Sequence, residues 1–324
     1  MKPIKHLLPL LLAIALLVPF FAFAGEKVPA IGILQYVQHG ALDLAREGFL
    51  KSLEDQGYVP GETITIDYQN GQADQSTCAS VADKFVADKV DLMLGIATPA
   101  VLALAGKTDA VPILGTAVTD YVEARLVKSN EAPGYNVSGT TDMNPVADQI
   151  RLIKRFMPQA QTVGILYTGS EINSQLQAAI AKTEIEALGM AYTEVTVNNS
   201  NDVQQAMLSL VNNCDVIYIP TDNVLASSMP IVAEVALAEK RPVICGDAGM
   251  VKEGGQFTLA IDYYKLGEQT GLMAGQILRG EAQVSQMPIQ RQSDYSYYVN
   301  KTLCDAIGLA IPEDMLAYAE ETGA

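Results

Sequence analysis

Polar side chains recur just after the short apolar segments of this sequence, where they are placed to hold a small charged molecule. Twelve candidates are Tyr36, His39, Thr98, Thr119, Asp120, Ser170, Glu171, Asn173, Ser174, Asp222, Asn223 and Asp247. Helix starts present free backbone N–H groups and the positive end of the helix dipole, which suits a ligand carboxylate. Four of the twelve are acidic and offer acceptors to an ammonium group. The mixture predicts a zwitterionic ligand, an amino acid with an apolar side chain.

Many of these residue types are also the usual N-caps of helices, so each such loop has a simpler interpretation. Thr98, for example, is predicted to be an N-cap with Pro99 at the first helical position. Tyrosines at or near strand ends can wall a ligand pocket, or they can belong to the core or the rim. These tyrosines are Tyr36, Tyr121, Tyr167 and Tyr263. The residues alone leave capping and ligand binding open as alternatives.

The elements that would position these loops alternate between apolar strands and amphipathic helices. In the first half, strands are expected over 30–35, 63–68, 90–95 and 111–115. Between the first two, apolar residues at helical spacing from Leu42 to Leu53 predict the buried face of a helix. The strands are apolar on both faces, which is typical of a parallel sheet covered by helices.

The same alternation restarts near residue 160. Strands are expected over 162–167, 191–197, 215–219 and 242–245. Helices are expected near 171–188, 201–212 and 224–239. The two halves also open alike, with VPAIGILQY and AQTVGILYT. This repetition predicts an α/β protein with two similar, doubly wound parallel-sheet lobes.

The two lobes are expected to be joined by short crossover strands, because no low-complexity linker separates them. The candidate crossovers are 135–141, 256–262 and a third near 284–292. Lobe 1 would hold residues 25–140 with 263–290, and lobe 2 would hold 141–262, with 291–324 partly packed on it. Ligands of open parallel sheets bind beyond the carboxyl ends of the strands. Two facing sheets therefore predict a cleft that is lined by the polar loops.

Residues 1–24 have the three-part pattern of a secretory signal peptide: two lysines, an apolar run and a small-residue cleavage site. We expect cleavage after Ala24 and a periplasmic protein; a retained membrane anchor is the alternative. Removing this segment takes away two lysines and no acidic residue, which changes the formal net charge from −16 to −18. Such a charge works against binding to nucleic acid or to anionic lipid surfaces.

The sequence offers little for metal or catalytic chemistry. Its cysteines are widely spaced among apolar or small residues and are expected to be buried free thiols: Cys78, Cys214, Cys245 and Cys304. Neither a zinc site nor a cofactor is expected. His39 is the one histidine after the signal segment, and the dinucleotide-binding, P-loop and nucleophile-elbow motifs do not occur. An enzyme is therefore disfavoured.

Four segments of the sequence resemble a known family. They are IGILQYVQHGALDLAREGFLKSLEDQGYVPGETITIDYQNGQAD, VGILYTGSEINS, VIYIPTDNVLASS and GDAGMVKEGGQFTLAIDYYKLGEQTG. The chain is similar, over nearly all of its length after residue 24, to the ABC-transporter substrate-binding proteins associated with tryptophan, tyrosine and phenylalanine. The resemblance implies a type I periplasmic-binding-protein fold with three interdomain crossovers. It also implies a ligand clamped by loops from both lobes.

The resemblance further implies roles for individual residues. Thr98 and the loop over residues 170–174 would hold the ligand carboxylate. Asp247, together with Asp222 or Asn223, would face the amino group.

Tyr36 and His39 would border the side-chain pocket. Gly40 follows His39 where the family often has a proline, and this departure affects the start of the first helix and the pocket beside it. The implied partners are a small amino acid, a membrane permease and its ATPase, and the protein is expected to be a monomer that closes about a hinge. A purine or a branched-chain amino acid as ligand, and delivery to a chemoreceptor, stay open as alternatives.

Overall fold

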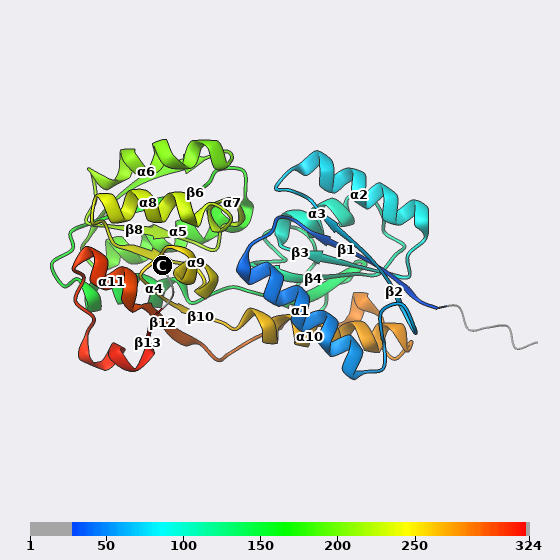
Figure 1. Ribbon diagram of the computed structural model, residues 1–324. Coiled ribbons are helices and arrows are strands. Elements are labelled where there is room, and N and C mark those ends of the chain that lie inside the picture. Colours follow the sequence, from blue (N-terminus) through cyan, green and yellow to red (C-terminus); the bar gives the residue numbers. More distant parts are fainter. Residues whose placement is uncertain (1–27, 322–324) are drawn as a thin grey trace, which may run out of the picture.

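The computed structural model describes residues 28–321, which form two α/β lobes side by side (Figure 1). The predicted signal peptide and its cleavage site after Ala24 lie outside the described residues. No helix in this described range is long and apolar enough to cross a membrane.

Lobe 1 is built on a six-stranded sheet whose neighbouring strands are all parallel, in the order β11-β5-β4-β3-β1-β2. The strands are β1 (Ala30–Gln35), β2 (Thr65–Asn70), β3 (Leu92–Ile96), β4 (Ile113–Val118), β5 (Val137–Thr141) and β11 (Gln290–Arg291). The helices are α1 (Gly40–Asp55), α2 (Gln75–Asp88), α3 (Thr98–Ala105) and α10 (Tyr263–Leu278). Strands β3 and β4 are buried at every residue, as expected for the centre of a parallel sheet.

Helix α10 comes late in the sequence, yet it packs tightly on α1 through glycines. A Cβ atom on Gly267 would lie 1.9 Å from the carbonyl oxygen of Ala45, and one on Gly48 would lie 2.0 Å from that of Tyr264. Such a close approach of two backbones requires glycine. The contact fixes α10 to lobe 1 and holds Tyr263, its first residue, at the boundary between the lobes.

Lobe 2 is built on a seven-stranded sheet in the order β13-β12-β10-β9-β8-β6-β7. The strands are β6 (Thr162–Thr168), β7 (Ala191–Val197), β8 (Val216–Ile219), β9 (Val243–Cys245), β10 (Phe257–Ala260), β12 (Ser296–Asn300) and β13 (Ala319–Glu320). Strand β12 runs antiparallel to β10, and the other pairs are parallel. The helices are α4 (Val146–Phe156), α5 (Ile172–Ala187), α6 (Val203–Val211), α7 (Asn223–Ala226), α8 (Met229–Ala238), α9 (Ala248–Glu253) and α11 (Lys301–Ile307). Short 3₁₀ helices span Ser200–Asp202, Val284–Gln286 and Glu313–Tyr318.

The chain passes between the two sheets after β5, after β10 and after β11. The first two passages follow the crossover strands that the sequence predicts. The third begins later than predicted, because residues 290–291 still pair with β5 of lobe 1. Residues 292–295 then carry the chain to β12.

One local prediction, a single long helix, is corrected by the structure, and another, the state of the cysteines, is confirmed. The single helix predicted over 224–239 is wrong: the structure has α7 and α8, separated at Ser227 and Ser228. Pro230 lies in the first turn of α8, where a missing N–H group breaks no helical hydrogen bond, so a new helix starts there. The prediction of free, buried thiols is confirmed for all four cysteines.

Candidate functional site

The polar loops at the carboxyl ends of both sheets meet between the lobes. His39, which follows β1, has its Nε2 atom 3.5 Å from Oδ1 of Asn223, which follows β8 in lobe 2. Ile172 of lobe 2 packs against the core of lobe 1, and Ala73 of lobe 1 packs against cores of both lobes. The structure therefore describes a closed cleft, and we call the buried polar region between these loops the interlobe site.

Glu171 is central to the lobe 2 side of the interlobe site. Its Oε2 atom accepts hydrogen bonds from Nδ2 of Asn223 at 2.5 Å and from Nδ2 of Asn173 at 3.0 Å. Its Oε1 atom is buried and has no partner. Burial, and then the negative charge of Asp222, raise the pKa of Glu171 to about 8. A cation bound beside Glu171 would restore its ionised form.

Asp222 stabilises the loop that carries Asn223. Its carboxylate caps α7 through the backbone N–H of Leu225 at 2.9 Å, and it accepts from the backbone and hydroxyl of Thr168 at 2.6 and 2.8 Å. Both oxygens are thus used within lobe 2. Capping explains Asp222 fully, whereas Asn223 faces the other lobe.

Asp247 caps a helix and still has one free oxygen. Its Oδ1 atom accepts from the backbone N–H of Met250 at 2.9 Å, and its Oδ2 atom is buried without a partner. Burial is the main cause that raises the pKa of Asp247 to about 6, and the charge of Asp142 adds to it. The loop lies against lobe 1, since a Cβ on Gly249 would be 3.2 Å from the backbone nitrogen of Ala41.

Thr98 is not an N-cap, which corrects the prediction from the sequence. The N-cap of α3 is Ala97, with φ 82° and ψ 151°, and Thr98 is the first helical residue. Residues other than glycine rarely adopt this backbone conformation, and such strain is common at functional sites. The strained turn points the hydroxyl of Thr98 into a buried position where it has no partner.

The buried polar atoms that lack a partner are concentrated in the interlobe site. Among the described residues there are seven: Thr98 Oγ1, Asn144 Nδ2, Glu171 Oε1, Asn173 Oδ1, Arg241 Nε, Asp247 Oδ2 and Gln256 Nε2. Five of them belong to the cleft loops or the first crossover. Three of these five are acceptors, Asn144 Nδ2 is a donor, and the Thr98 hydroxyl can be either. Buried polar groups are normally paired, so the interlobe site is where the described chain has the most unmet hydrogen-bonding capacity.

Other candidates lie at the edge of the interlobe site. Ser174 is buried, and its hydroxyl accepts from Nδ2 of Asn173 at 3.2 Å. Ser170 is exposed and lines a groove of about 320 Å³ together with Thr98 and Ile172. The Ser170–Ser174 loop thus reaches from the rim of the cleft to its interior.

His39 is the N-cap of α1, which begins at Gly40 without a side-chain cap. Burial lowers the pKa of His39 to about 4, so the imidazole is neutral at pH 7. It therefore contributes a neutral ring to the interlobe site.

The four tyrosines separate into two groups. The hydroxyl of Tyr36 donates to the carbonyl oxygen of Ala73, and the charges of Glu171 and Asp222 help burial to raise its pKa, so Tyr36 lies at the cleft. The hydroxyl of Tyr263 donates to Asp142 at 2.7 Å. The other two tyrosines, Tyr121 and Tyr167, lie away from the interlobe site.

Tyr121 is fully buried, and its hydroxyl donates to the carbonyl oxygens of Gly115 and Thr140 inside lobe 1. The hydroxyl of Tyr167 donates a hydrogen bond to Oε2 of Glu194 at 3.1 Å on the surface of lobe 2.

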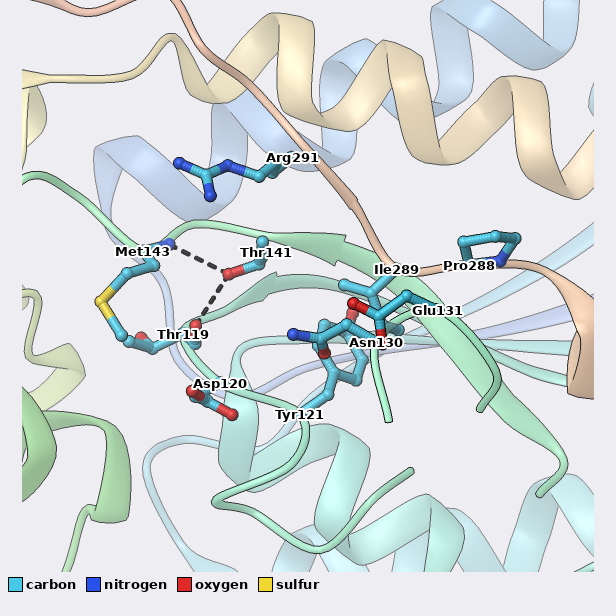
Figure 2. Close-up of a pocket in the computed structure, with 10 residues that line it drawn as sticks. All are labelled: Thr119, Asp120, Tyr121, Asn130, Glu131, Thr141, Met143, Pro288, Ile289 and Arg291. Atoms are coloured by element: carbon cyan, nitrogen blue, oxygen red, sulfur yellow. Dashed lines mark hydrogen bonds between the residues drawn. The ribbon is translucent and has the colours of Figure 1, made fainter. Parts of the chain in front are cut away.

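Thr119 and Asp120 both line a cavity that lies apart from the interlobe site, but their side chains have different partners. The hydroxyl of Thr119 donates to Asp142 at 3.0 Å, towards the interlobe site. Asp120 accepts from the backbone N–H groups of Val122 and Glu123, both at 2.9 Å, and lines a separate cavity of about 370 Å³. Figure 2 shows Asp120 and Arg291 on opposite sides of this cavity, which we call the hinge-side cavity because β11 and the first crossover border it.

Two buried residues beside the interlobe site, Asp142 and Asn144, are not among the twelve candidates predicted from the sequence. Both are buried in the first crossover, directly after β5. The backbone N–H of Ile261 in the second crossover donates to Oδ1 of Asn144 at 3.0 Å. The rule that identified the other loops, a polar residue after an apolar strand, applies to this strand too and could have found them.

The chain is similar to known proteins over nearly its whole length. A family model described as "ABC transporter substrate binding protein" matches residues 30–323. A tyrosine-binding protein of Clostridioides difficile (strain R20291) is 42% identical over 285 residues, which are 88% of this chain and 82% of that protein.

Two solved structures are similar in different degrees. An ABC domain from Streptococcus pneumonia in complex with L-Trp is 36% identical, covers 90% of this chain and 98% of its own, and has a TM-score of 0.87. The ligand-free, open structure of a substrate-binding protein with adhesive properties from Clostridium difficile is 44% identical, covers 91% of this chain and 100% of its own, and has a TM-score of 0.69. The structural neighbours are type I periplasmic-binding proteins, which confirms the predicted fold class.

Proposed function

The chain belongs to the ABC transporter substrate-binding protein family, and we propose that it captures a free amino acid in the interlobe site. The cluster of buried, unpartnered polar atoms carries this proposal. Glu171 Oε1, Asn173 Oδ1 and Asp247 Oδ2 need donors, and Asn144 Nδ2 needs an acceptor. An ammonium group and a carboxylate on one small molecule supply both.

Charge favours an amino acid over a neutral solute. Glu171 and Asp247 are buried carboxyl groups without a basic partner in the salt bridges of the described chain. A buried carboxylate is stable only when a cation or several donors compensate it. A ligand ammonium provides that compensation, whereas a sugar or a neutral purine does not.

The carboxylate end of the ligand is proposed to bind on the lobe 1 side. The N-caps of α1 and α3, His39 and Ala97, make no side-chain cap, which leaves the first N–H groups of α1 and the N–H of Thr98 without an acceptor from a cap side chain. In α3, Pro99 has no N–H, and the N–H groups of Ala100 and Val101 donate to the carbonyl oxygen of Ala97. The hydroxyl of Thr98 is directed into the same region. Helix starts of this kind favour anions.

An aromatic side chain is the proposed third part of the ligand. The relatives bind tyrosine and L-Trp, according to their descriptions, at 42% and 36% identity. The ring of Tyr36 and the neutral imidazole of His39 border the cleft and offer flat surfaces for an aromatic ring. Tyrosine, phenylalanine and tryptophan are therefore the proposed ligands.

Closure about a hinge is proposed as the response to the ligand. The chain is more similar in sequence to the ligand-free, open structure, yet it superposes better on the L-Trp complex, with TM-scores of 0.69 and 0.87. This difference supports a second, open arrangement of the same lobes. In the proposed division, lobe 1 (25–140 and 263–290) and lobe 2 (141–262 and 291–324) move about the three crossovers. A ligand that touches both lobes shifts the population towards closure.

The physiological role is proposed to be uptake. A cleaved signal peptide would deliver the protein to the periplasm, where it would act as a monomer and present the ligand to a permease that is driven by an ATPase. The family consists of solute-binding proteins, which supports binding in place of catalysis.

A thermal-shift screen of the twenty amino acids, two purines and several sugars tests the ligand class. Tyrosine, phenylalanine or tryptophan at about 100 times its Kd should stabilise the protein by about 2.7 kcal/mol, which raises the melting temperature by several degrees. Leucine, isoleucine and valine are the matched controls for apolar side chains. A response to a sugar or a purine, without a response to any amino acid, would refute the proposal.

A further inference from the structure

A groove of about 320 Å³ leads from the interlobe site to the surface of the molecule, although the cleft is closed. At its inner end lie Thr98, Glu171 and Asn173, which are 2%, 2% and 5% exposed. Each of these three residues has a buried polar side-chain atom without a hydrogen-bond partner. At its outer end, Arg125 and Ser170 are exposed to solvent. We call this space the rim groove, and its volume is within the range of about 300–1,000 Å³ that small-molecule pockets have.

The walls of the rim groove include apolar side chains from both lobes. Pro99 and Leu102 of α3 line it from lobe 1, and Ile172, the first residue of α5, lines it from lobe 2. Leu102 is exposed and Ile172 is half-buried, so both side chains have apolar surface that a ligand in the groove would cover. Removing such surface from water is favourable. The rim groove therefore suits a part of a ligand that carries an apolar side chain.

Arg125 places a positive charge at the outer end of the rim groove. The salt bridges formed among residues 28–321 include neither Arg125 nor Glu123, which lines the same groove. A guanidinium group that is not used in an ion pair is well suited to bind a carboxylate, because its N–H groups match the two carboxylate oxygens. The groove thus has a hydroxyl at its inner end, an apolar wall and a cation at its outer end.

We propose that the rim groove is a second subsite that takes the next residue of a short peptide, so that the protein binds dipeptides with an aromatic first residue as well as free aromatic amino acids. The inference rests on the proposed function, in which the Thr98 hydroxyl binds the ligand carboxylate. In a dipeptide this carboxylate is replaced by an amide carbonyl, which still accepts a hydrogen bond from Thr98, and the chain continues into the groove that Thr98 lines. The second side chain packs on Leu102 and Ile172, and the terminal carboxylate pairs with Arg125.

Calorimetric titration with tyrosine, tyrosylalanine and alanyltyrosine tests the second subsite, since the two peptides have the same composition. Tyrosylalanine should bind with a Kd within about tenfold of that of tyrosine, because it loses one charged contact at Thr98 and gains contacts in the rim groove. Alanyltyrosine should bind at least about 30-fold more weakly than tyrosylalanine, because its free ammonium group and its aromatic ring belong to different residues.

Substitutions in the rim groove should separate the two ligands. Leu102→Trp fills the groove and should weaken the binding of tyrosylalanine at least about tenfold, while the Kd for tyrosine stays within about twofold. Arg125→Gln should weaken tyrosylalanine about threefold, as expected for an exposed ion pair, and should leave tyrosine unchanged. Leu272→Trp is the matched control, since Leu272 is an exposed leucine of α10 that does not line the groove, and it should change neither Kd.

The outcomes distinguish this inference from the proposed function. If tyrosine binds but tyrosylalanine binds no better than alanyltyrosine, the inference is overturned and the proposed function stands. Equal losses of tyrosine and tyrosylalanine binding in folded Leu102→Trp also overturn it, because the groove is then not a separate subsite. If tyrosylalanine binds and no free amino acid does, the proposed function fails and the second subsite survives. If none of these compounds binds, both fail.

Discussion

The interlobe site and the hinge-side cavity differ in how their polar groups are satisfied. The hinge-side cavity has a volume of about 370 Å³ and contains charged residues, but Asp120, Glu131 and Arg291 are half-buried or exposed. In the interlobe site, Thr98, Glu171 and Asp247 are almost completely buried and each has an unpartnered polar atom. A volume lined by exposed charges is filled by water, whereas buried polar groups without partners lose free energy until a ligand or an ordered water bonds to them.

The difference is the reason that the proposed ligand site is placed at the unpaired polar atoms and not in a cavity lined by exposed charges. In the proposed function, the unpaired acceptors of lobe 2 bind the ammonium group, and the Thr98 hydroxyl and the start of α1 in lobe 1 bind the carboxylate. Substitutions in the interlobe site should therefore affect binding strongly, and those in the hinge-side cavity should not.

The largest effect is expected for Asp247→Ala. Removing one partner of a buried charge pair costs about 2–5 kcal/mol, so the affinity for an aromatic amino acid should fall at least about 30-fold. Isothermal titration calorimetry measures this loss, and circular dichroism checks that the variant is folded. An unchanged Kd in folded Asp247→Ala would remove this residue from the site.

Thr98→Ala should have a smaller effect. The substitution removes one hydroxyl that we propose bonds to the ligand carboxylate, which is worth about 1–1.5 kcal/mol, or roughly a tenfold increase in Kd. Thr98→Ser keeps the hydroxyl and is the matched control. If serine and alanine weaken binding equally, the hydroxyl does not contact the ligand.

The ligand-free protein should become more stable as the pH falls from 9 to 7. The pKa of Glu171 is raised to about 8 in the folded state, so the folded protein binds this proton in a range where the unfolded chain has lost it. The gain should be about 1 kcal/mol in the free energy of unfolding, measured by urea denaturation. Glu171→Gln should lose this part of the pH dependence, and Asp120→Asn should retain it. A parallel slope in Glu171→Gln would contradict the assignment.

Asp120→Ala is expected to have the smallest effect on binding. Asp120 stabilises a turn through Val122 and Glu123 and faces the hinge-side cavity, so the Kd should stay within about twofold. The same titration measures it. A loss as large as that of Asp247→Ala would mean that the two regions do not differ as described.

The periodicity of the sequence predicted the architecture well for a physical reason. Buried parallel strands such as β3 and β4 are apolar throughout, and the helices between them have one apolar face, so local pattern and burial agree. The correction at Pro230 shows the limit of the same rule. Apolar spacing runs through residues 224–239, but the missing N–H group of proline divides the helix.

The candidate site was predicted only in outline, because a helix cap and a ligand contact use the same residue types. Asp222 and Asp247 look alike in the sequence, and both cap a helix in the structure. They differ in the oxygen that does not cap the helix. In Asp222 this Oδ2 atom accepts a hydrogen bond from the backbone N–H of Thr168, whereas Oδ2 of Asp247 has no partner. The strained conformation of Ala97 and the contact between His39 and Asn223 depend on tertiary packing, so no local sequence pattern predicts them.

Calorimetric titration of the unsubstituted protein with tyrosine and with tyramine tests the central claim most directly. Tyramine has the same ring and ammonium group but no carboxylate, so it can satisfy the lobe 2 acceptors but not the lobe 1 donors. We predict one tyrosine bound per chain, and an affinity for tyramine that is lower by at least about 100-fold. Equal affinities for the two compounds, or no binding of tyrosine, phenylalanine or tryptophan, would contradict a site that recognises both ends of an amino acid.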